Sequence, residues 1–404
     1  MKRKLFLFIG MSIVLLNALT GCGDTGSDEL VKAAVIPESI QQSEEVVLET
    51  TVMETVLAEE ESLEPQYGAE ELFELGQKYY DILDYEQAFS YYEKAAELDY
   101  GYAYGMIGNM YFAGKYVEKD AAKAVEYWIL AVENGADATY DAGIAYSYSE
   151  GNGVEKDIEQ AIYWYQSASE KGHVDAMVTL GNFYLDGVDV EQNYELAFRY
   201  YEMAAEQENV GAISNIGWMY ENGIGVEADA NQAITYYTKA ADLGDYIAAN
   251  NLAEMYVKGE MVEKDTTKAL AYYEQAIEWG SATAAYNLGA RYRDGSIGLQ
   301  DYELAISYYE KAVNLGHAGA ANQLGMMYYS GEGGEPNYQL AFECFEMAGE
   351  MGLPKGYYNV GYMYYNGLLE DTADDANAKK YLKLAIDTGY TGEDLENIKA
   401  YIES

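Results

Sequence analysis

Basic residues are scarce in this sequence of 404 residues. Lys and Arg number 24 against 69 Asp and Glu, so the formal net charge is −45. Sequence-independent binding of nucleic acid depends on basic groups that displace counterions, and this composition excludes it. A bare anionic membrane should also repel the chain. The acidity therefore serves either attraction to basic partners and hydrated surroundings, or solubility alone.

Histidine is nearly absent as well. The two histidines, His173 and His317, each directly follow a glycine, and we expect both in turns that lie far apart along the chain. This placement argues against a His-based catalytic pair and against a His metal site. We therefore predict no catalytic residue, no metal and no cofactor.

Residues 1–21 have the pattern of an export signal. Lys-Arg-Lys at positions 2–4 precedes an apolar run over residues 5–19, which is short for a membrane-spanning helix. The following L-T-G-C, ending at Cys22, resembles the lipobox of bacterial lipoprotein signal peptides. The resemblance implies a lipid on Cys22 that anchors the exported protein to the bacterial cell membrane, facing outward. An ordinary signal peptide with a chance cysteine is the alternative.

Cysteine is as scarce as histidine, because Cys344 is the only one besides Cys22. Once Cys22 carries lipid, no intramolecular disulfide is possible. Cys344 stands where other repeats of the chain have the first tyrosine of an aromatic pair. We therefore expect a buried thiol without a reactive role.

Residues 22–66 differ in composition from the rest of the chain. They are rich in Glu and Ser, nearly devoid of Lys and Arg, and their apolar residues lack sustained helical spacing. We predict an acidic, disordered tether that holds the folded part away from the envelope surface.

A pattern that recurs about every 36 residues begins at residue 67 and extends to residue 390. An alanine opens the second half of each of its nine units. These alanines are Ala88, Ala124, Ala161, Ala197, Ala233, Ala269, Ala305, Ala341 and Ala378.

Each unit predicts two amphipathic helices joined by a loop. An Asp or Asn four residues before each of these alanines is expected to cap the second helix, and glycines follow both helices. A small residue, usually glycine, lies inside the first helix, where it predicts close approach of the paired helix. Residues 391–404 predict a final helix that covers the end of the stack.

The units resemble the Sel-one-like repeat (SLR) family, a relative of the tetratricopeptide repeats. Two good copies are IGWMYENGIGVEADANQAITYYTKAADLG from Ile216 and LAEMYVKGEMVEKDTTKALAYYEQAIEWG from Leu252. The resemblance implies an all-α fold, a right-handed α-solenoid superhelix of about nine helix-turn-helix repeats with a C-terminal capping helix. It also implies a non-enzymatic scaffold for protein–protein interaction, with a concave groove lined by the first helices.

Two other functions remain open. Some cysteine-rich SLR proteins are linked to penicillin binding or β-lactam hydrolysis, but this chain lacks their regular cysteine pairs and has no S-x-x-K motif. A glycan-binding surface protein would use the tyrosines instead. We expect a protein or peptide partner, no nucleic acid and no small-molecule substrate.

A row of amides marks the candidate binding site. The position two residues before the central small residue is an amide in five consecutive units: Asn215, Asn251, Asn287, Gln323 and Asn359. A primary amide both donates and accepts, so a ladder of amides could hold the backbone of an extended peptide. Alternatively, the same amides cap or bridge neighbouring helices.

Aromatic residues accompany this row. Tyr and Trp bury a large area with little loss of entropy, which favours protein recognition. The candidate groove aromatics are Tyr140, Trp218, Tyr286, Tyr358 and Tyr362.

Overall fold

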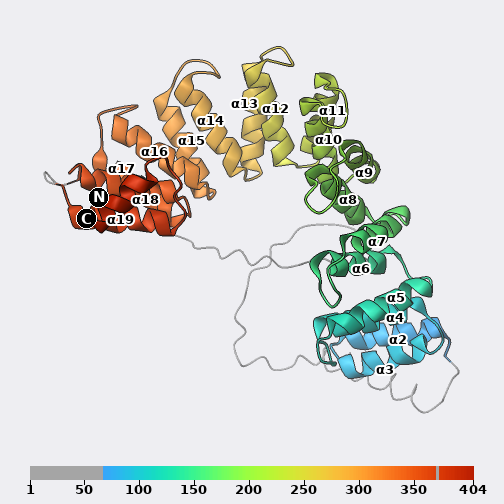
Figure 1. Ribbon diagram of the computed structural model, residues 1–404. Coiled ribbons are helices and arrows are strands. Elements are labelled where there is room, and N and C mark those ends of the chain that lie inside the picture. Colours follow the sequence, from blue (N-terminus) through green and yellow to red (C-terminus); the bar gives the residue numbers. More distant parts are fainter. Residues whose placement is uncertain (1–66, 370–372) are drawn as a thin grey trace, which may run out of the picture. The chain divides into compact units, whose positions relative to one another are not determined.

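The computed structural model describes residues 67–369 and 373–404, and within these ranges it consists of 19 helices without a strand (Figure 1). The chain divides into two compact units, Met1–His173 and Val174–Ser404. The predicted signal peptide, the tether and Cys22 lie outside the described residues.

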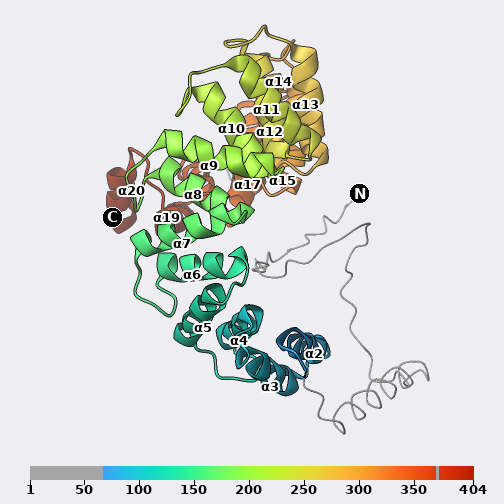
Figure 2. The ribbon, with the colours of Figure 1, turned by 90° about the vertical axis from the view of Figure 1, so that its right-hand side faces the viewer.

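The first unit contains three helix pairs. They are α2 (Ala69–Asp81) with α3 (Tyr85–Ala96), α4 (Gly101–Ala113) with α5 (Ala121–Glu133), and α6 (Ala138–Glu150) with α7 (Ile158–Glu170). Figure 2 shows α2 to α5 side by side, because each second helix also packs against the first helix of the next pair.

The second unit continues the same order of helices. Its helices are α8 (Val174–Asp186), α9 (Tyr194–Glu206), α10 (Val210–Asn222), α11 (Ala230–Asp242), α12 (Tyr246–Lys258), α13 (Thr266–Glu278), α14 (Ala282–Asp294), α15 (Tyr302–Asn314), α16 (Ala318–Ser330), α17 (Tyr338–Glu350), α18 (Pro354–Tyr365), α19 (Asp375–Asp387) and α20 (Leu395–Glu403). Consecutive pairs stack along the chain, and α20 packs against α19 at the end. Ile398 of α20 is buried, as a capping helix requires.

The predicted caps are confirmed. The side chain before each second helix accepts a hydrogen bond of 2.8–3.2 Å from a backbone N–H of the first turn. These residues are Asp84, Asp120, Asp157, Asn193, Asp229, Asp265, Asp301, Asn337 and Asp374. They satisfy amides that have no partner within the helix.

Seven glycines inside the first helices allow close packing of the two helices of a pair, as predicted. A Cβ placed on them would lie 2.5–3.0 Å from a bulky side chain of the second helix, whereas one on Gly143 would lie 3.4 Å from Trp128 of the preceding pair. The contacts are Gly76 with Tyr92, Gly108 with Trp128, Gly181 with Tyr201, Gly217 with Tyr237, Gly289 with Tyr309, Gly325 with Phe345 and Gly361 with Leu382. These side chains form much of the core.

A second aromatic contact recurs within the pairs. A tyrosine of the first helix stacks on one of the second, with interplanar angles of 3–18°. Such pairs are Tyr79–Tyr91, Tyr111–Tyr127, Tyr184–Tyr200, Tyr220–Tyr236, Tyr256–Tyr272 and Tyr292–Tyr308. Cys344 takes the equivalent place beside Tyr328. It is half-buried, less than predicted, and burial raises the pKa of its thiol to about 12.

No helix within residues 67–369 and 373–404 is long and apolar enough to cross a membrane.

Candidate binding face

The predicted amides occupy equivalent places on five first helices of the second unit. Asn215 lies in α10, Asn251 in α12, Asn287 in α14, Gln323 in α16 and Asn359 in α18, and each is half-buried. We call the side of these helices that carries the amides and the residues beside them the first-helix face. Helix periodicity places these amides on one face because each stands two residues before the buried small residue.

Three of these amides bond to the preceding repeat. The Nδ2 of Asn287 donates to Oδ1 of Asn250 at 3.0 Å, and the Nδ2 of Asn359 donates to Oδ1 of Asn322 at 2.8 Å. Between them, Gln323 Nε2 lies 3.5 Å from the Tyr286 hydroxyl. Each bond spans 37 residues of sequence and joins two first helices. The amides therefore bridge neighbouring helices, which is the second of the two roles considered for them.

The other two amides interact with the buried tyrosines of the second helices. Asn215 hydrogen-bonds with Tyr201, and Asn251 with Tyr237. Burial raises the pKa of both phenols, that of Tyr201 to about 12, so both are neutral at physiological pH. The hydroxyls of Tyr201 and Tyr237 donate to Asn182 Oδ1 at 2.7 Å and to Glu221 Oε2 at 2.8 Å, so each amide donates to the phenol oxygen. Each amide still has donor and acceptor capacity beyond the bond described here, since a primary amide offers two N–H groups and an oxygen with two lone pairs. Peptide binding by the amides stays a prediction.

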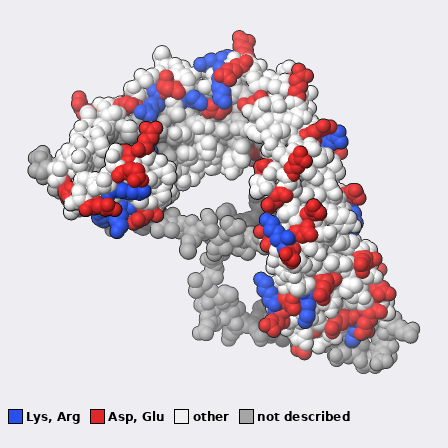
Figure 3. Space-filling model, viewed as in Figure 1, with Lys and Arg blue, Asp and Glu red and all other residues white. Residues whose placement is uncertain are grey.

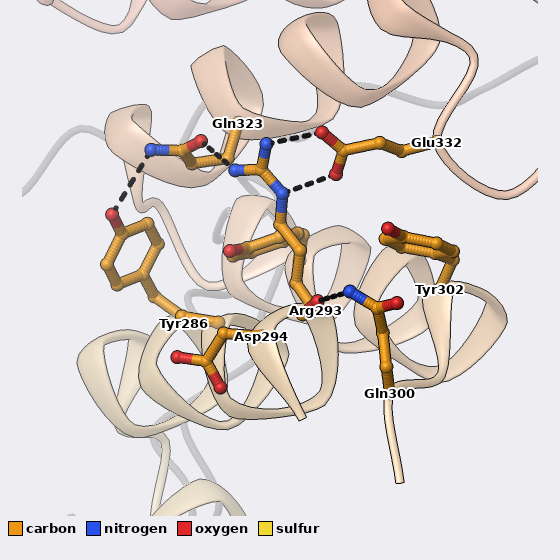
Figure 4. A pocket seen from close by; sticks show the side chains of 9 residues that line it. Tyr286, Arg293, Asp294, Gln300, Tyr302, Gln323 and Glu332 are labelled. Carbon is orange, nitrogen blue, oxygen red and sulfur yellow. Dashed lines mark hydrogen bonds and ion pairs between the residues drawn. The ribbon is translucent and has the colours of Figure 1, made fainter. Parts of the chain in front are cut away.

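Gln323 also lies in a polar cleft of about 360 Å³ (Figure 4). Arg293 of α14 lies at its centre and forms a two-pronged ion pair with Glu332, at 2.6 and 2.8 Å. The remaining guanidinium nitrogen donates to Gln323 Oε1 at 2.9 Å. The hydrogen bond to Arg293 lowers the pKa of Glu332, so this carboxylate is ionised at neutral pH. The contacts of Arg293 with Glu332 and Gln323 therefore connect the seventh repeat to the eighth.

The predicted aromatics have different environments. Trp218 and Tyr362 are exposed, with 36% and 45% of their surface accessible. Tyr286 stacks on His317 at 4.4 Å, and Tyr358 stacks on Tyr390 at 4.6 Å.

The prediction for Tyr140 is wrong. It is buried in the core of the first unit, with only 7% of its surface exposed, and its ring covers Gly105 of α4. The glycine leaves room for the ring, so the side chain turns into the interface between repeats and is not available to a partner.

Charged pairs between helices were not foreseen from the sequence. Arg291 Nη2 bonds to Glu254 Oε2 at 2.7 Å, and Glu254 also accepts the hydroxyl of buried Tyr273. In the first unit, fully buried Asp141 accepts from Lys171 Nζ at 2.7 Å and Ser167 Oγ at 2.5 Å. Asp141 holds the place that an amide holds in later repeats. This aspartate at an amide position was the feature of the sequence that could have predicted a buried charged pair.

Among the charged residues of the surface, acidic ones outnumber basic ones, as Figure 3 shows for one face. Among the described residues, no group of three His, Cys, Asp or Glu side chains could hold a metal ion. The capping acids are evenly distributed along the stack, which keeps them apart.

Stacked helix pairs with small-residue seams and an exposed first-helix face define an α-helical repeat protein of the scaffold class. The Sel1 repeat model matches residues 66–100, 101–135, 136–173, 174–209, 210–245, 247–281, 282–317, 318–353 and 354–390. The chain therefore belongs to the Sel1 repeat family. Sel1-repeat proteins are generally protein-interaction scaffolds, and the fold is typically non-catalytic.

Two solved structures resemble this chain over most of its length. One is a protective antigen present in uropathogenic Escherichia coli strains that displays an SLR fold; it is 29% identical, with a TM-score of 0.62, over 83% of this chain and 72% of that one. The other is a Sel1 repeat protein from Oxalobacter formigenes, 24% identical with a TM-score of 0.63, over 81% of this chain and 96% of that one.

Proposed function

We propose that the protein is a surface-anchored, non-enzymatic scaffold whose first-helix face holds an extended segment of a protein partner. The observation that carries the proposal is that one repeat position holds an exposed apolar side chain in the fifth, eighth and ninth repeats. Trp218, Met326 and Tyr362 each directly follow the central glycine of their helix, and 36%, 38% and 45% of their surfaces are accessible. Large apolar side chains held in register on a rigid stack are typical anchors of protein interfaces.

The amides beside these anchors support the same function. Hydrogen bonds to neighbouring side chains fix the orientation of these amides before a partner arrives, so less entropy is lost on binding. The remaining donors and acceptors are suited to the backbone of an extended chain, whatever its side chains. In this arrangement the exposed apolar residues select the partner and the amides hold its backbone.

The anchoring part of the proposal rests on residues 1–66. The basic start, the apolar run and the L-T-G-C sequence support export and lipid attachment at Cys22, and the acidic composition that follows supports a tether. The relative described as a protective antigen is consistent with an outward-facing position.

The test begins with capture of partners from envelope extracts and their identification by mass spectrometry. Binding of an identified partner is then measured for the wild type and for Trp218→Ala, Tyr362→Ala and Met326→Ala. We expect at least one of these variants to lose about 30-fold in affinity, which corresponds to about 2 kcal/mol. Tyr163→Ala is the matched control, because Tyr163 is 60% exposed but lies on a second helix.

Unchanged affinity in all three variants would refute the assignment to the first-helix face. A glycan array provides the complementary measurement. Strong binding to a glycan, without any protein partner, would favour the alternative of a glycan-binding surface protein.

A further inference from the structure

A pocket lined by tyrosines lies at the C-terminal end of the second unit. Its volume is about 250 Å³, and it lies among α18, α19 and α20. The lining residues are Tyr358, Tyr362, Tyr365, Leu382, Asp394, Asn397, Ile398 and Tyr401. Three of the tyrosines come from α18 at spacings of four and three residues, which places them on one side of that helix. Two of them belong to the first-helix face, so the pocket closes one end of it.

The tyrosines surround the pocket in a fixed arrangement. Tyr358 is held flat against Tyr390, and Tyr365 meets Tyr401 of α20 edge-on at 5.1 Å. Tyr362 and Tyr365 nevertheless expose 45% and 53% of their surfaces. The rings therefore keep accessible aromatic surface at a concave site, although neighbours already restrain them.

The pocket has a negative charge and no positive one. Asp394 is the only charged residue of its lining. Its Oδ1 accepts from the Tyr390 hydroxyl at 3.0 Å, and its side chain also bonds with Tyr358. Burial alone would raise the pKa of Asp394, but these two hydroxyl bonds and a bond from its own backbone together lower the pKa, so the carboxylate is ionised at neutral pH.

Cations already lie against aromatic rings in this region, and one of these rings lines the pocket. Lys379 Nζ is 5.3 Å from the ring centre of Tyr401, and Lys380 Nζ is 4.8 Å from that of Tyr381. The faces of tyrosine rings attract positive charge, and an adjacent carboxylate adds to the attraction. A site with four such rings and one carboxylate is complementary to an organic cation.

We propose that this pocket receives an arginine side chain of the bound partner. A guanidinium group is flat, weakly hydrated and always charged, so it stacks on tyrosine while donating to a carboxylate. A lysine ammonium group is more strongly hydrated and lacks the flat surface. The net charge of −45 would attract a partner with basic side chains. This inference rests on the proposed function, because it names the side chain that a partner places at the end of the first-helix face.

The test uses three acetylated and amidated tripeptides, Gly-X-Gly, in which X is arginine, lysine or citrulline. Citrulline has the shape of arginine without the charge. Binding to the full-length protein is followed by ligand-detected NMR at fixed ionic strength. We expect the arginine peptide to bind with a millimolar Kd, the lysine peptide several-fold more weakly, and the citrulline peptide at least tenfold more weakly.

Two variants locate the binding. Tyr365→Leu and Asp394→Asn should each weaken binding of the arginine peptide at least fivefold. Tyr365 is exposed, and asparagine keeps an oxygen that can accept from Tyr390, so both variants should fold; circular dichroism checks this. Asp387→Asn removes an exposed charge at the end of α19, outside the lining of the pocket, and controls for general attraction to an acidic protein.

Two results would overturn the inference: equal binding of the arginine and citrulline peptides, or equal effects of Asp394→Asn and Asp387→Asn. The proposed function would survive either result if partner binding still depended on Trp218. Unchanged partner affinity in the Trp218, Met326 and Tyr362 variants, with intact arginine binding, would overturn the proposed function and leave the pocket as a separate site.

Discussion

The side chain of Asn287 donates to that of Asn250 across the interface between the sixth and seventh repeats, at 3.0 Å. The same bond recurs between Asn359 and Asn322. Asn287 and Asn359 are predicted ligands for a peptide, yet they also connect consecutive first helices. Any experiment on the amides must therefore separate their effect on stability from their effect on binding.

A double-mutant cycle on Asn287 and Asn250 makes this separation. We expect each single change to alanine to lower the free energy of unfolding by about 1 kcal/mol, because one side-chain hydrogen bond between half-buried groups is lost. The double variant should lose less than the sum of the two. Urea unfolding followed by circular dichroism measures all three.

Asn314→Ala is the matched control for this cycle. Asn314 is exposed at the end of α15, and a surface change of this kind usually stays within about 0.5 kcal/mol. Additive effects of the Asn287 and Asn250 changes would mean that the bond contributes nothing to the stack.

Two glycines of α10 should respond oppositely to substitution by alanine. Gly217→Ala places a Cβ 2.7 Å from the ring of fully buried Tyr237, so we expect a loss of about 1–3 kcal/mol through overpacking. Gly211→Ala meets only an ordinary contact at 3.5 Å and should stabilise the helix by about 0.5–1 kcal/mol.

Thermal unfolding of the two variants provides the comparison. The sixth repeat has Ala253 at the place of Gly217, so a ring can adjust to a methyl group in at least one repeat. A gain in stability from both substitutions would show that this seam is not tightly packed.

Removal of Lys171 should destabilise the first unit. Asp141 is fully buried, and Lys171→Met leaves its carboxylate with the hydroxyl of Ser167 but without a positive partner. Loss of one partner of a buried pair costs about 3–5 kcal/mol, and we expect about 3 because Lys171 is 38% exposed. Adding Asp141→Asn should restore part of the loss, as measured by denaturant unfolding; no recovery would indicate that Lys171 acts through packing of its stem.

Stability should depend on the protonation of His317. Burial lowers the pKa of this histidine, and its Nδ1 accepts from the backbone N–H of Ala320 at 3.0 Å, which only an unprotonated nitrogen can do. The unfolded state, with a pKa of about 6.5, therefore binds more protons in the window below that value. This contribution to stability is complete above that pH and is lost as the pH falls through the folded-state pKa.

The variant His317→Asn keeps a capping side chain that does not titrate. Between pH 7 and pH 5 its melting temperature should fall less than that of the wild type. The carboxylates are common to both proteins, so parallel curves would exclude a role for His317.

Periodicity made the fold predictable from the sequence. The same caps, glycines and tyrosines recur across the nine copies of one pattern. Recurrence therefore separates the residues that determine the fold from residues that occur in a single copy by chance. The alternation of helices, the nine Asp and Asn caps and the reason for glycine inside the first helices all follow from residues that recur.

Features that belong to one repeat could not be predicted in this way. Tyr140 occupies the same repeat position as Tyr286 and Tyr358 of the first-helix face. Its ring is buried instead, because Gly105 of the preceding repeat has no side chain and leaves room for it in the core. The pairing of Arg293 with Glu332 likewise depends on one particular arginine, because the sixth repeat has Glu260 at the place of Glu332 but the fifth has Glu221 at the place of Arg293. Such contacts depend on the particular neighbours of a residue, and repeat statistics do not contain them.

Within the second unit each helix makes its main contacts with the helices directly before and after it in sequence. Tension applied between an anchored N-terminal region and a partner would therefore act on one interface after another. Separation of one helix pair exposes only its immediate neighbour, since the main contacts among the described helices of this unit are between consecutive ones. Under load we expect the repeats to unfold one after another, so that the protein lengthens in successive steps of about one repeat each.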